Sequence, residues 1–464
     1  MALQIAALGI CVAVFALAAY RSVHVGILML VAASAVGVGL ADMPVKEVLG
    51  GFPIDLVVLL AGVTFFFGVA QANGTVDKLI DSALRRLGER TSALPLAFFG
   101  MTTAIGSMGN PGAALVMVPI GMNIAKKKNL DPMLMALAMG TGISAGGFAP
   151  TSLFGIVTYG TAREAGISLS PMLLFVVALV FNLLLLAVAY LIFGRSRARH
   201  SLPSQLTVQH AHELEFATVG TSGGDGADSE VTGSGGAGTG GTGGTAPEHL
   251  RRDDGRPVGF SILQKITVAS MAALVGTVVI TAALGANPNV GLIAFAFGAV
   301  LALLDPKSCN IGISKIDWST ILLVGGIITY VGVLEHLGAV DLLGDFAASM
   351  SVPLIAAFVV CVIAGLVSAF ASTTGMLAAL VPLAIPLVAA GGIPGWAMIC
   401  AIGVCASIVD VSPFSTVGAT MVATTPDESE RPRVTRLLMR WGLSMVVIGP
   451  VAMVIGLIVP SMIM

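Results

Sequence analysis

Charged residues are scarce in this chain. Asp, Glu, Lys and Arg make up only 10% of its 464 residues, whereas a soluble domain carries about 25%. The 23 basic and 25 acidic residues give a net charge of −2, without the basic excess of a nucleic-acid-binding protein. The five cysteines include no CxxC pair, so we expect neither a disulfide framework nor a zinc site. The chain is instead 56% hydrophobic, which predicts a polytopic membrane protein.

Long apolar runs dominate the rest of the sequence. A membrane-spanning helix needs about 20 mainly apolar residues, and we expect complete spans at 3–20, 23–41, 54–72, 172–194, 265–285, 290–304, 318–336 and 437–459. Two other apolar segments, about 133–160 and 396–424, are interrupted by polar residues, glycine and proline, which predicts a broken helix in each. Two more, about 94–125 and 352–390, are longer than one span and have a polar centre.

A hydrophilic segment divides the apolar regions into two halves. Within it, residues 220–245 are mostly Gly, Ser and Thr, and they cannot bury enough apolar surface to fold. We therefore expect a first transmembrane repeat at 1–194, a flexible linker at 195–260 and a second transmembrane repeat at 261–464.

The two halves repeat one another at a nearly constant spacing. Matched Pro, Asp and Ser residues carry more weight than matched glycines, because the chain has 57 glycines. Pairs 264 residues apart are Gly62 and Gly326, Gly68 and Gly332, Gly74 and Gly338, and Asp77 and Asp341. Pairs 263 residues apart are Pro119 and Pro382, Ser144 and Ser407, Pro150 and Pro413, Ser152 and Ser415, and Gly155 and Gly418. The sequence thus predicts two structural repeats.

The basic residues indicate how the halves cross the membrane. If 94–125 and 352–390 are re-entrant hairpins, each half has five transmembrane helices, and this odd number inverts the second repeat relative to the first. All of the 23 basic residues except Lys46 and Arg163 then lie on one side. Because basic residues mark the cytoplasmic side, we expect a cytoplasmic linker and both termini outside, in a bacterial inner membrane.

Each hairpin segment has a centre suited to begin a half-helix. In the first, Asn110 can cap a helix, and Pro111, which lacks an N–H, suits its first position. The free N–H groups and partial positive charge of that helix end would then point into the membrane interior. The matching centre is Ser372–Gly375, whose three hydroxyls can cap a helix or donate to a carboxylate. The alternatives are a plain kink at Pro111 and hydroxyls that bond back to the preceding turn.

The broken helices hold the other polar groups of the interior. Gly146 and Gly147, which precede Pro150, should open the first helix and expose carbonyls to a cation such as Na⁺. In the second, Ser412–Pro413 repeats the cap-then-proline pattern, and Asp410 lies within an apolar run. An acidic residue in the membrane is by default a cation ligand or a proton carrier. The alternative is an Asp that caps a half-helix.

These features together predict a secondary transporter with its site near the midplane, where the breaks converge. No Lys or Arg lies in a predicted membrane interior, so half-helix N-termini, hydroxyls and co-bound cations would have to hold an anionic substrate. A cation/proton antiporter that uses Asp410 is the alternative. An intramembrane hydrolase that uses Ser144 is a remote one, because all six histidines lie in loops, the linker or near span ends. We expect a transporter and not an enzyme.

The two inverted repeats resemble the ion transporter superfamily, since a Ser-Asn-Thr-like tripeptide at each hairpin tip precedes an apolar run and a proline. Within that superfamily the chain resembles the divalent anion:sodium symporters. The stretch from about 25 to 175 is similar to the N-terminal domain of malonate-type dicarboxylate carriers. The resemblance implies a homodimer in which a transport domain of hairpins and broken helices moves against a scaffold, as an elevator. It also implies import of a small dicarboxylate, of the malonate or succinate class, with Na⁺, or with H⁺ as the alternative coupling ion.

The resemblance places substrate binding at the hairpin tips, on Asn110 and on Ser372–Thr374, beside two sodium sites. Together with the breaks, it gives as candidate substrate contacts Asn110, Pro111, Gly112, Thr151, Ser372, Thr373, Thr374, Ser412 and Pro413. The candidate cation ligands are Ser107, Asn110, Ser144, Gly147, Thr373, Ser407 and Asp410. The expected partners are the dicarboxylate, the lipid bilayer and a second copy of the chain, with no nucleic acid.

Overall fold

Helices form nearly all of the regular structure. The computed structural model describes residues 2–21, 23–86, 93–109, 111–194, 259–283, 289–339, 353–369, 373–384, 387–388 and 392–463, and these contain no strand. The predicted linker, 195–260, lies outside the described residues except for its last two positions. The predicted all-α polytopic membrane protein is confirmed.

The helices of the first half are α1 (Ala2–Arg21), α2 (Val25–Gly39), α3 (Val45–Gly50), α4 (Ile54–Ala72), α5 (Thr75–Arg86), α6 (Leu94–Gly106), the 3-10 helix η2 (Pro111–Val116), α7 (Met117–Lys127), α8 (Pro132–Gly147), α9 (Leu153–Glu164) and α10 (Pro171–Phe193). Those of the second half are α11 (Ile262–Ala283), α12 (Val290–Leu304), α13 (Pro306–Ser314), α14 (Trp318–His336), α16 (Pro353–Ser368), α17 (Thr373–Leu383), α19 (Gly395–Ser407), α20 (Thr416–Ala423), α21 (Arg431–Met453), the π-helical turn η4 (Val454–Ile458) and α22 (Val459–Ser461).

Several helices have surfaces that suit a lipid environment. Among the described residues, α4, α10, α14 and the continuous stretch Arg431–Ser461 are long and apolar enough to cross a membrane. Only 33% of the most apolar window of α10 is buried, and its exposed side chains include Val180, Leu184 and Leu191. Exposed aliphatic side chains along a whole helix are favourable against hydrocarbon, where water is absent.

Corresponding helices of the two halves have corresponding lengths. Helices α2 and α12 both have 15 residues, α4 and α14 both have 19, and α10 and α21 both have 23. A break separates α8 from α9 in the first half and α19 from α20 in the second. The predicted two-repeat organisation accounts for this correspondence, because one structural unit would then occur twice.

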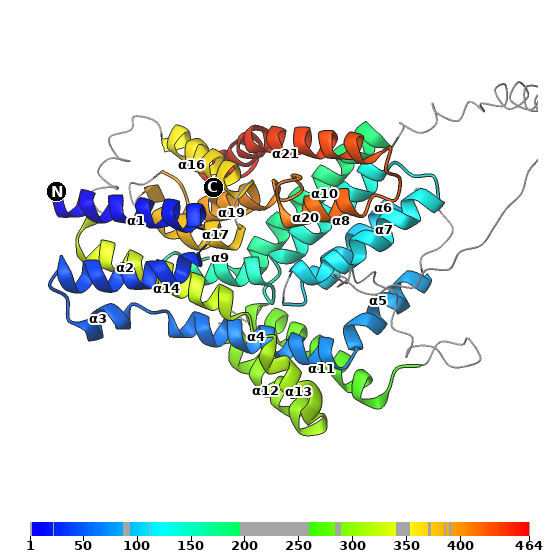
Figure 1. The fold of residues 1–464 in the computed structure, drawn as a ribbon, viewed down its shortest axis with the longest axis horizontal. Coiled ribbons are helices and arrows are strands. Elements are labelled where there is room, and N and C mark those ends of the chain that lie inside the picture. The colour runs from blue at the N-terminus through cyan, green and yellow to red at the C-terminus, as the bar shows by residue number, and fades with distance from the viewer. Residues whose placement is uncertain are drawn as a thin grey trace, which may run out of the picture. The chain divides into compact units, whose positions relative to one another are not determined.

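Glycines join the two halves at two equivalent helix crossings. In Figure 1 the blue α4 lies beside the green α12, and α2 lies beside α14. A Cβ added to Gly326 would lie 2.0 Å from Gly26 O, and one added to Gly62 would lie 2.2 Å from Gly291 O. Only glycine permits backbones to approach so closely. Each crossing therefore pairs a helix of one half with a helix of the other.

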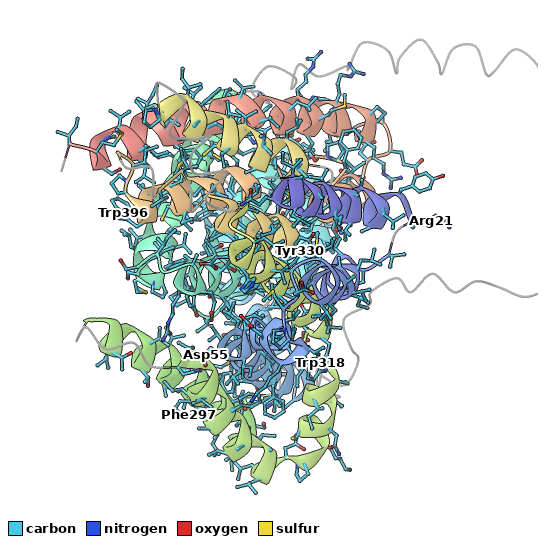
Figure 2. All side chains as sticks on the ribbon, turned by 90° about the vertical axis from the view of Figure 1, so that its left-hand side faces the viewer. Arg21, Asp55, Phe297, Trp318, Tyr330 and Trp396 are labelled. Carbon is cyan, nitrogen blue, oxygen red and sulfur yellow. The ribbon has the colours of Figure 1, made fainter. Side chains whose placement is uncertain are left out.

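A buried tyrosine links the N-terminal helix to α14. Tyr330 is 1% exposed and lies among the helices, as Figure 2 shows, whereas Trp318 at the start of the same helix is 54% exposed. The Tyr330 hydroxyl donates to Ala7 O at 2.7 Å. A buried phenol needs such a partner, because an unpaired hydroxyl is costly in an apolar interior.

Candidate functional site

The two broken helices and the two segments predicted to be hairpins, 94–125 and 352–390, line a cavity of about 450 Å³, which we name the central cavity. Six of the residues that line it were predicted from the sequence: Pro111, Gly112, Ser144, Thr373, Thr374 and Asp410. The remaining lining includes the apolar residues Leu115, Ile143, Leu153, Phe154, Phe414 and Val417. No Lys or Arg occurs among the described residues that line it. Polar groups from both halves thus face one apolar space without a cationic side chain.

A carboxylate and a hydroxyl form the main polar contact of the central cavity. The Thr373 hydroxyl lies 2.5 Å from Asp410 Oδ1 and 2.6 Å from Asp410 Oδ2, so it donates to this carboxylate. The Ser368 hydroxyl lies 3.1 Å from the Thr373 hydroxyl. Thr373 is also the first residue of α17, so the carboxylate lies beside a helix N-terminus. A partial positive charge and a charge-assisted hydrogen bond both stabilise a carboxylate there.

Two serines at equivalent positions of the halves meet at the wall of this cavity, which Ser144 lines and Ser407 does not. Ser144 Oγ, in α8, donates to Ser407 Oγ, the last residue of α19, at 2.8 Å. The two side chains are 5% and 1% exposed and are 263 residues apart. Residues related by a two-fold axis contact one another only next to that axis. The pair therefore lies where the axis of two inverted repeats would pass.

The first broken helix opens directly after the glycine pair Gly146 and Gly147. Helix α8 continues through Gly147, and the break comprises residues 148–152. The helix therefore ends at the predicted glycine pair, and cation binding by the carbonyls of the break stays a prediction. These glycines also permit close packing, because a Cβ at Gly146 would lie 2.4 Å from Thr103 O in α6 and one at Gly147 would lie 2.5 Å from the Phe154 ring.

The first break holds the end of α6. The Thr151 hydroxyl donates to Ser107 O and the Ser152 hydroxyl to Gly106 O, both at 2.7 Å. These bonds satisfy carbonyls that a helix C-terminus leaves without partners. Gly109 adds a third bond between this turn and the break, because its carbonyl accepts from Leu153 N at 2.9 Å. Its φ of +85° lies in the left-handed region, which favours glycine. Neither Thr151 nor Ser107 lines the central cavity.

The second break holds the end of α16 in the same way. Ser412 Oγ donates to Ala369 O at 3.3 Å, and Ala369 lies 263 residues after Gly106, the acceptor in the first half. Ser415 Oγ donates to Ser412 O at 2.9 Å and to the Asp410 carbonyl. Hydroxyls of both breaks thus fix the first helix of each hairpin segment. Pro413 is half-buried and does not line the central cavity.

The remaining candidates are placed as follows. Asn110 and Ser372 lie outside the described residues. Gly147 and Ser407 are buried behind the central cavity and not on its wall. Within the described ranges, no three His, Cys, Asp or Glu side chains come together as a transition-metal site would require. The oxygen donors that do come together are hydroxyls and one carboxylate, which suit a hard cation such as Na⁺.

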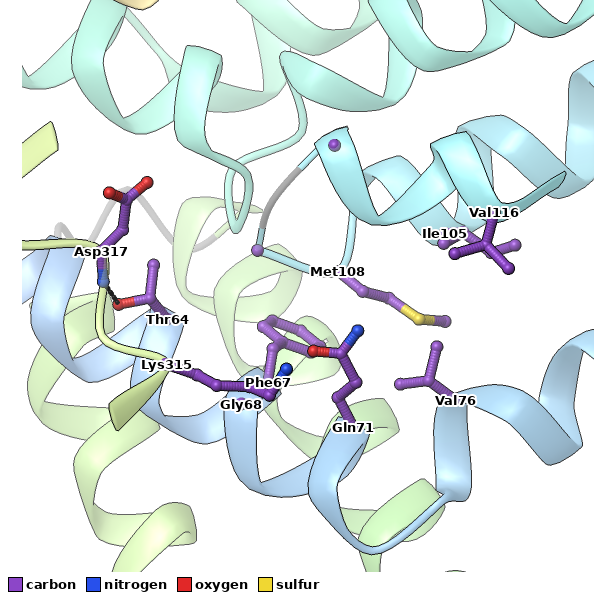
Figure 3. A pocket seen from close by; sticks show the side chains of 12 residues that line it. Thr64, Phe67, Gly68, Gln71, Val76, Ile105, Met108, Val116, Lys315 and Asp317 are labelled. Atoms are coloured by element: carbon purple, nitrogen blue, oxygen red, sulfur yellow. Dashed lines mark hydrogen bonds between the residues drawn. The ribbon is translucent and has the colours of Figure 1, made fainter. Parts of the chain in front are cut away.

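The sequence did not indicate a second cavity, of about 370 Å³, which we name the lysine cavity. Figure 3 shows it between α4 and the turn after α6, with Gln71 from α4 and Lys315 from the segment before α14. Gly112 lines both this cavity and the central one. Lys315 directly follows the short helix α13 and does not lie in an apolar run, so its sequence position does not mark it as part of a membrane site.

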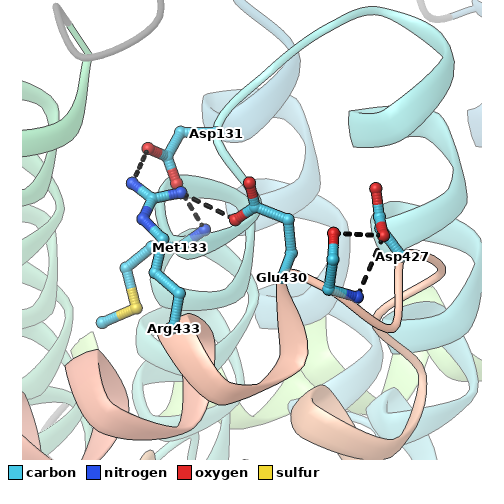
Figure 4. A network of polar contacts seen from close by, with 6 residues as sticks. Asp131, Met133, Asp427, Glu430 and Arg433 are labelled. Carbon is cyan, nitrogen blue, oxygen red and sulfur yellow. Dashed lines mark hydrogen bonds and ion pairs between the residues drawn. The ribbon is translucent and has the colours of Figure 1, made fainter.

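An ion-pair network joins the start of α8 to the start of α21. Arg433 donates to Asp131 Oδ2 and to Glu430 Oε2, both at 2.9 Å, as Figure 4 shows. Asp131 is 4% exposed and also accepts from Met133 N at 2.8 Å, which caps α8. The arginine therefore neutralises a buried capping carboxylate and connects the two halves away from the central cavity.

Comparison with known families adds to this geometry. Residues 1–147 match the family model described as the dicarboxylate carrier protein MatC N-terminus. A search among curated proteins finds no match to the chain. The predicted resemblance to malonate-type dicarboxylate carriers is confirmed for the matched residues, which extend from α1 to the end of α8. The match indicates a dicarboxylate transporter rather than an enzyme.

Proposed function

We propose that the protein imports a small dicarboxylate, of the malonate or succinate class, together with Na⁺ by alternating access. The observation that carries the proposal is the match of residues 1–147 to dicarboxylate carriers. These residues supply η2 and α8, which form part of the wall of the central cavity. We place the protein in a bacterial inner membrane, with the linker in the cytoplasm and both termini outside, because most basic residues would then be cytoplasmic.

The charges around the central cavity favour cation coupling. A dicarboxylate brings two carboxylates next to Asp410, and no described Lys or Arg lines the cavity to neutralise them. The N-terminus of a helix contributes only about half a positive charge. Since an uncompensated charge is costly away from water, the remaining negative charge requires cations to enter with the substrate. Protons would serve the same purpose and are the alternative coupling ion.

The helix starts at the cavity provide suitable contacts for the substrate. Helix α17 begins at Thr373, so its first N–H groups and the Thr374 hydroxyl can donate to one carboxylate. The segment that begins at Pro111 and Gly112 lines the same cavity and would face the second carboxylate. Asn110 and Ser372 complete these two sets in our proposal.

The cation ligands would be oxygens of the second break, of the start of α17 and of the serine pair beside the central cavity. Asp410 and Thr373 supply a carboxylate and a hydroxyl, and Ser144 and Ser407 supply two further hydroxyls close to the axis. Oxygen donors of this kind suit Na⁺. Binding of Na⁺ would reduce the negative charge next to Asp410 before the dicarboxylate enters.

The packing of the hairpin segments suggests how access could alternate. Helix α17 packs against α14 and α9, whereas the corresponding residues of the first half, η2 and the start of α7, pack against α8 and α20 and make no comparable contact with α4 among the described residues. If the two repeats are inverted, the first half can adopt the packing now seen in the second half, and the second half that of the first. The resulting state would open to the opposite side of the membrane. We extend the proposal to a homodimeric elevator, in which the hairpin segments and broken helices move together against α4, α14 and their neighbours.

Uptake by purified protein in liposomes tests the proposed function. Labelled malonate and succinate should accumulate under an inward Na⁺ gradient, and unlabelled C3–C4 dicarboxylates should compete while monocarboxylates should not. Parallel liposomes with a K⁺ gradient or a proton gradient identify the coupling ion. Absence of uptake under both Na⁺ and proton gradients, across the whole dicarboxylate panel, would contradict the proposal.

A cation/proton antiporter remains the second candidate, because Asp410 lies on the wall of the central cavity and is hydrogen-bonded to a hydroxyl. In that case Na⁺ should drive proton movement without any dicarboxylate, and Asp410→Asn should abolish it. A pH-sensitive dye inside the same liposomes distinguishes the candidates. The proposed symporter should move Na⁺ only when dicarboxylate is present.

A further inference from the structure

The lysine cavity has a counterpart in the other half of the chain. A cavity of about 320 Å³ lies between α3 and α14, and we name it the glutamate cavity. Three pairs of equivalent positions, each 264 residues apart, line the two cavities: Gly68 and Gly332, Gln71 and Glu335, and Gly51 and Lys315. The same place in the two halves therefore carries different side chains.

The lysine cavity presents an available cation. Lys315 is exposed and makes no ion pair within the part of the chain that the structure describes. Asp317 also lines the cavity, but its carboxylate accepts from Thr320 N at 3.0 Å and from the Thr320 hydroxyl at 2.9 Å. Figure 3 shows the Lys315 chain extending along Phe67 while the Asp317 carboxylate points away from it. The ammonium group is thus the charge that faces the cavity.

The glutamate cavity has the opposite character. It is lined by Glu47, Glu335 and His336, and His336 Nδ1 lies 3.5 Å from Glu47 Oε1. At the position equivalent to Gln71 this cavity has the carboxylate of Glu335, and at the position equivalent to Lys315 it has Gly51. A dianion would be attracted to the first cavity and repelled by the second.

The lysine cavity also adjoins the central cavity. Gly112, in η2, lines both cavities, and Gly109, in the turn between α6 and η2, lines the lysine cavity. An anion that passes this turn would meet Lys315 and Gln71 next. An ammonium and an amide N–H₂ can donate to the two oxygens of one carboxylate.

We propose that Lys315 and Gln71 form a carboxylate-binding station on the cytoplasmic side of the transport path, and that the equivalent outer position lacks such a station. This inference rests on the proposed function and adds a sidedness to it. The apparent affinity for dicarboxylate is higher at the cytoplasmic face because of Lys315. The glutamates lower the apparent affinity at the outer face.

Vesicles of defined orientation test this proposal. Everted vesicles expose the cytoplasmic face and right-side-out vesicles the outer face, and both are prepared from cells that express the whole chain. With labelled succinate, Lys315→Gln should raise KM about fivefold in everted vesicles, the scale expected for loss of one exposed ion pair. The maximal rate in everted vesicles should rise by a similar factor, because a substitution cannot change the equilibrium of transport, and the KM in right-side-out vesicles should not change. Glu335→Gln should lower KM in right-side-out vesicles only.

Matched variants separate a binding role from a structural one. Lys307→Gln removes another exposed lysine, in α13 and outside the lysine cavity, and should leave KM unchanged at both faces. Lys315→Arg should restore KM, and high ionic strength should reduce the difference between wild type and Lys315→Gln, since salt screens exposed charges. If Lys315→Gln behaves like Lys307→Gln, or raises KM equally at both faces, the proposal is wrong. Absence of any dicarboxylate transport by the wild type would overturn the proposed function as well.

Discussion

The Thr373 hydroxyl donates to the Asp410 carboxylate across the central cavity, at 2.5 Å and 2.6 Å from its two oxygens. The bond joins the start of α17 to the second break, which are segments 37 residues apart. Because it connects a hairpin segment to a broken helix, it couples the proposed substrate contacts to the proposed cation ligands. It is therefore the contact whose removal should be most informative.

Removal of this hydroxyl should weaken cation binding. Thr373→Val keeps the shape of the side chain but leaves Asp410 without its donor, and loss of a hydrogen bond to a charged group corresponds to about 10- to 100-fold in affinity. We expect the Na⁺ concentration for half-maximal uptake to rise by that factor, while Thr373→Ser stays close to wild type. Thr420→Val is a control, because that hydroxyl donates only within α20. Equal Na⁺ dependence in Thr373→Val and wild type would contradict this role.

The contact between Ser144 and Ser407 should be a coupled pair. Each single change to alanine should lower the free energy of unfolding by about 1 kcal/mol, the typical worth of a hydrogen bond. The double variant should lose less than the sum of the single losses, because each single change already removes the shared bond. Thermal unfolding in detergent measures the three values. Additive losses would indicate that the two hydroxyls act independently.

The helix crossings should be intolerant of any side chain. Gly326→Ala places a Cβ 2.0 Å from Gly26 O, so α2 and α14 must separate. We expect a loss of about 1–3 kcal/mol, as for other overpacked contacts. Gly276→Ala in α11 has no atom within 4 Å of the new Cβ and should stabilise the protein slightly. Similar unfolding temperatures for the two variants would contradict the close approach.

The arginine of the ion-pair network should stabilise the junction of the two halves. Arg433→Gln leaves the carboxylate of Asp131, which is 4% exposed, without a cation. We expect the free energy of unfolding to fall by about 1 kcal/mol, since Arg433 is itself 42% exposed and screened by solvent. Arg436→Gln, on the same helix, should have a smaller effect. A high-salt measurement should reduce the difference between the two variants.

Most of the helical architecture could be predicted from hydropathy. The expected spans 54–72, 290–304 and 318–336 coincide with α4, α12 and α14, because apolar length is a strong signal for membrane helices. Both broken helices also occur where polar residues and proline interrupt an apolar run. Helix α8 ends at Gly146 and Gly147 as predicted, but their close packing against α6 and Phe154 depends on tertiary contacts that a glycine pair in a sequence does not reveal.

The candidate site could be predicted only in part. Asp410 and Thr373 stood out because a carboxylate and consecutive hydroxyls are rare in apolar runs, and the structure brings both to one cavity. Thr151 and Ser412 are predicted substrate contacts, and in the structure their hydroxyls donate to backbone carbonyls. Lys315 was missed, because its place beside the turn after α6 depends on packing between distant helices and not on local sequence.

The central claim is that movement of a dicarboxylate is coupled to movement of Na⁺. The most direct measurement loads liposomes with equal labelled succinate inside and outside, applies an inward Na⁺ gradient, and follows both succinate and ²²Na⁺. We predict that succinate becomes concentrated inside, that ²²Na⁺ entry rises in proportion when succinate is present, and that Asp410→Asn abolishes both. Succinate that stays at equal concentration on both sides under the Na⁺ gradient, with ²²Na⁺ entry unaffected by succinate, would contradict the claim.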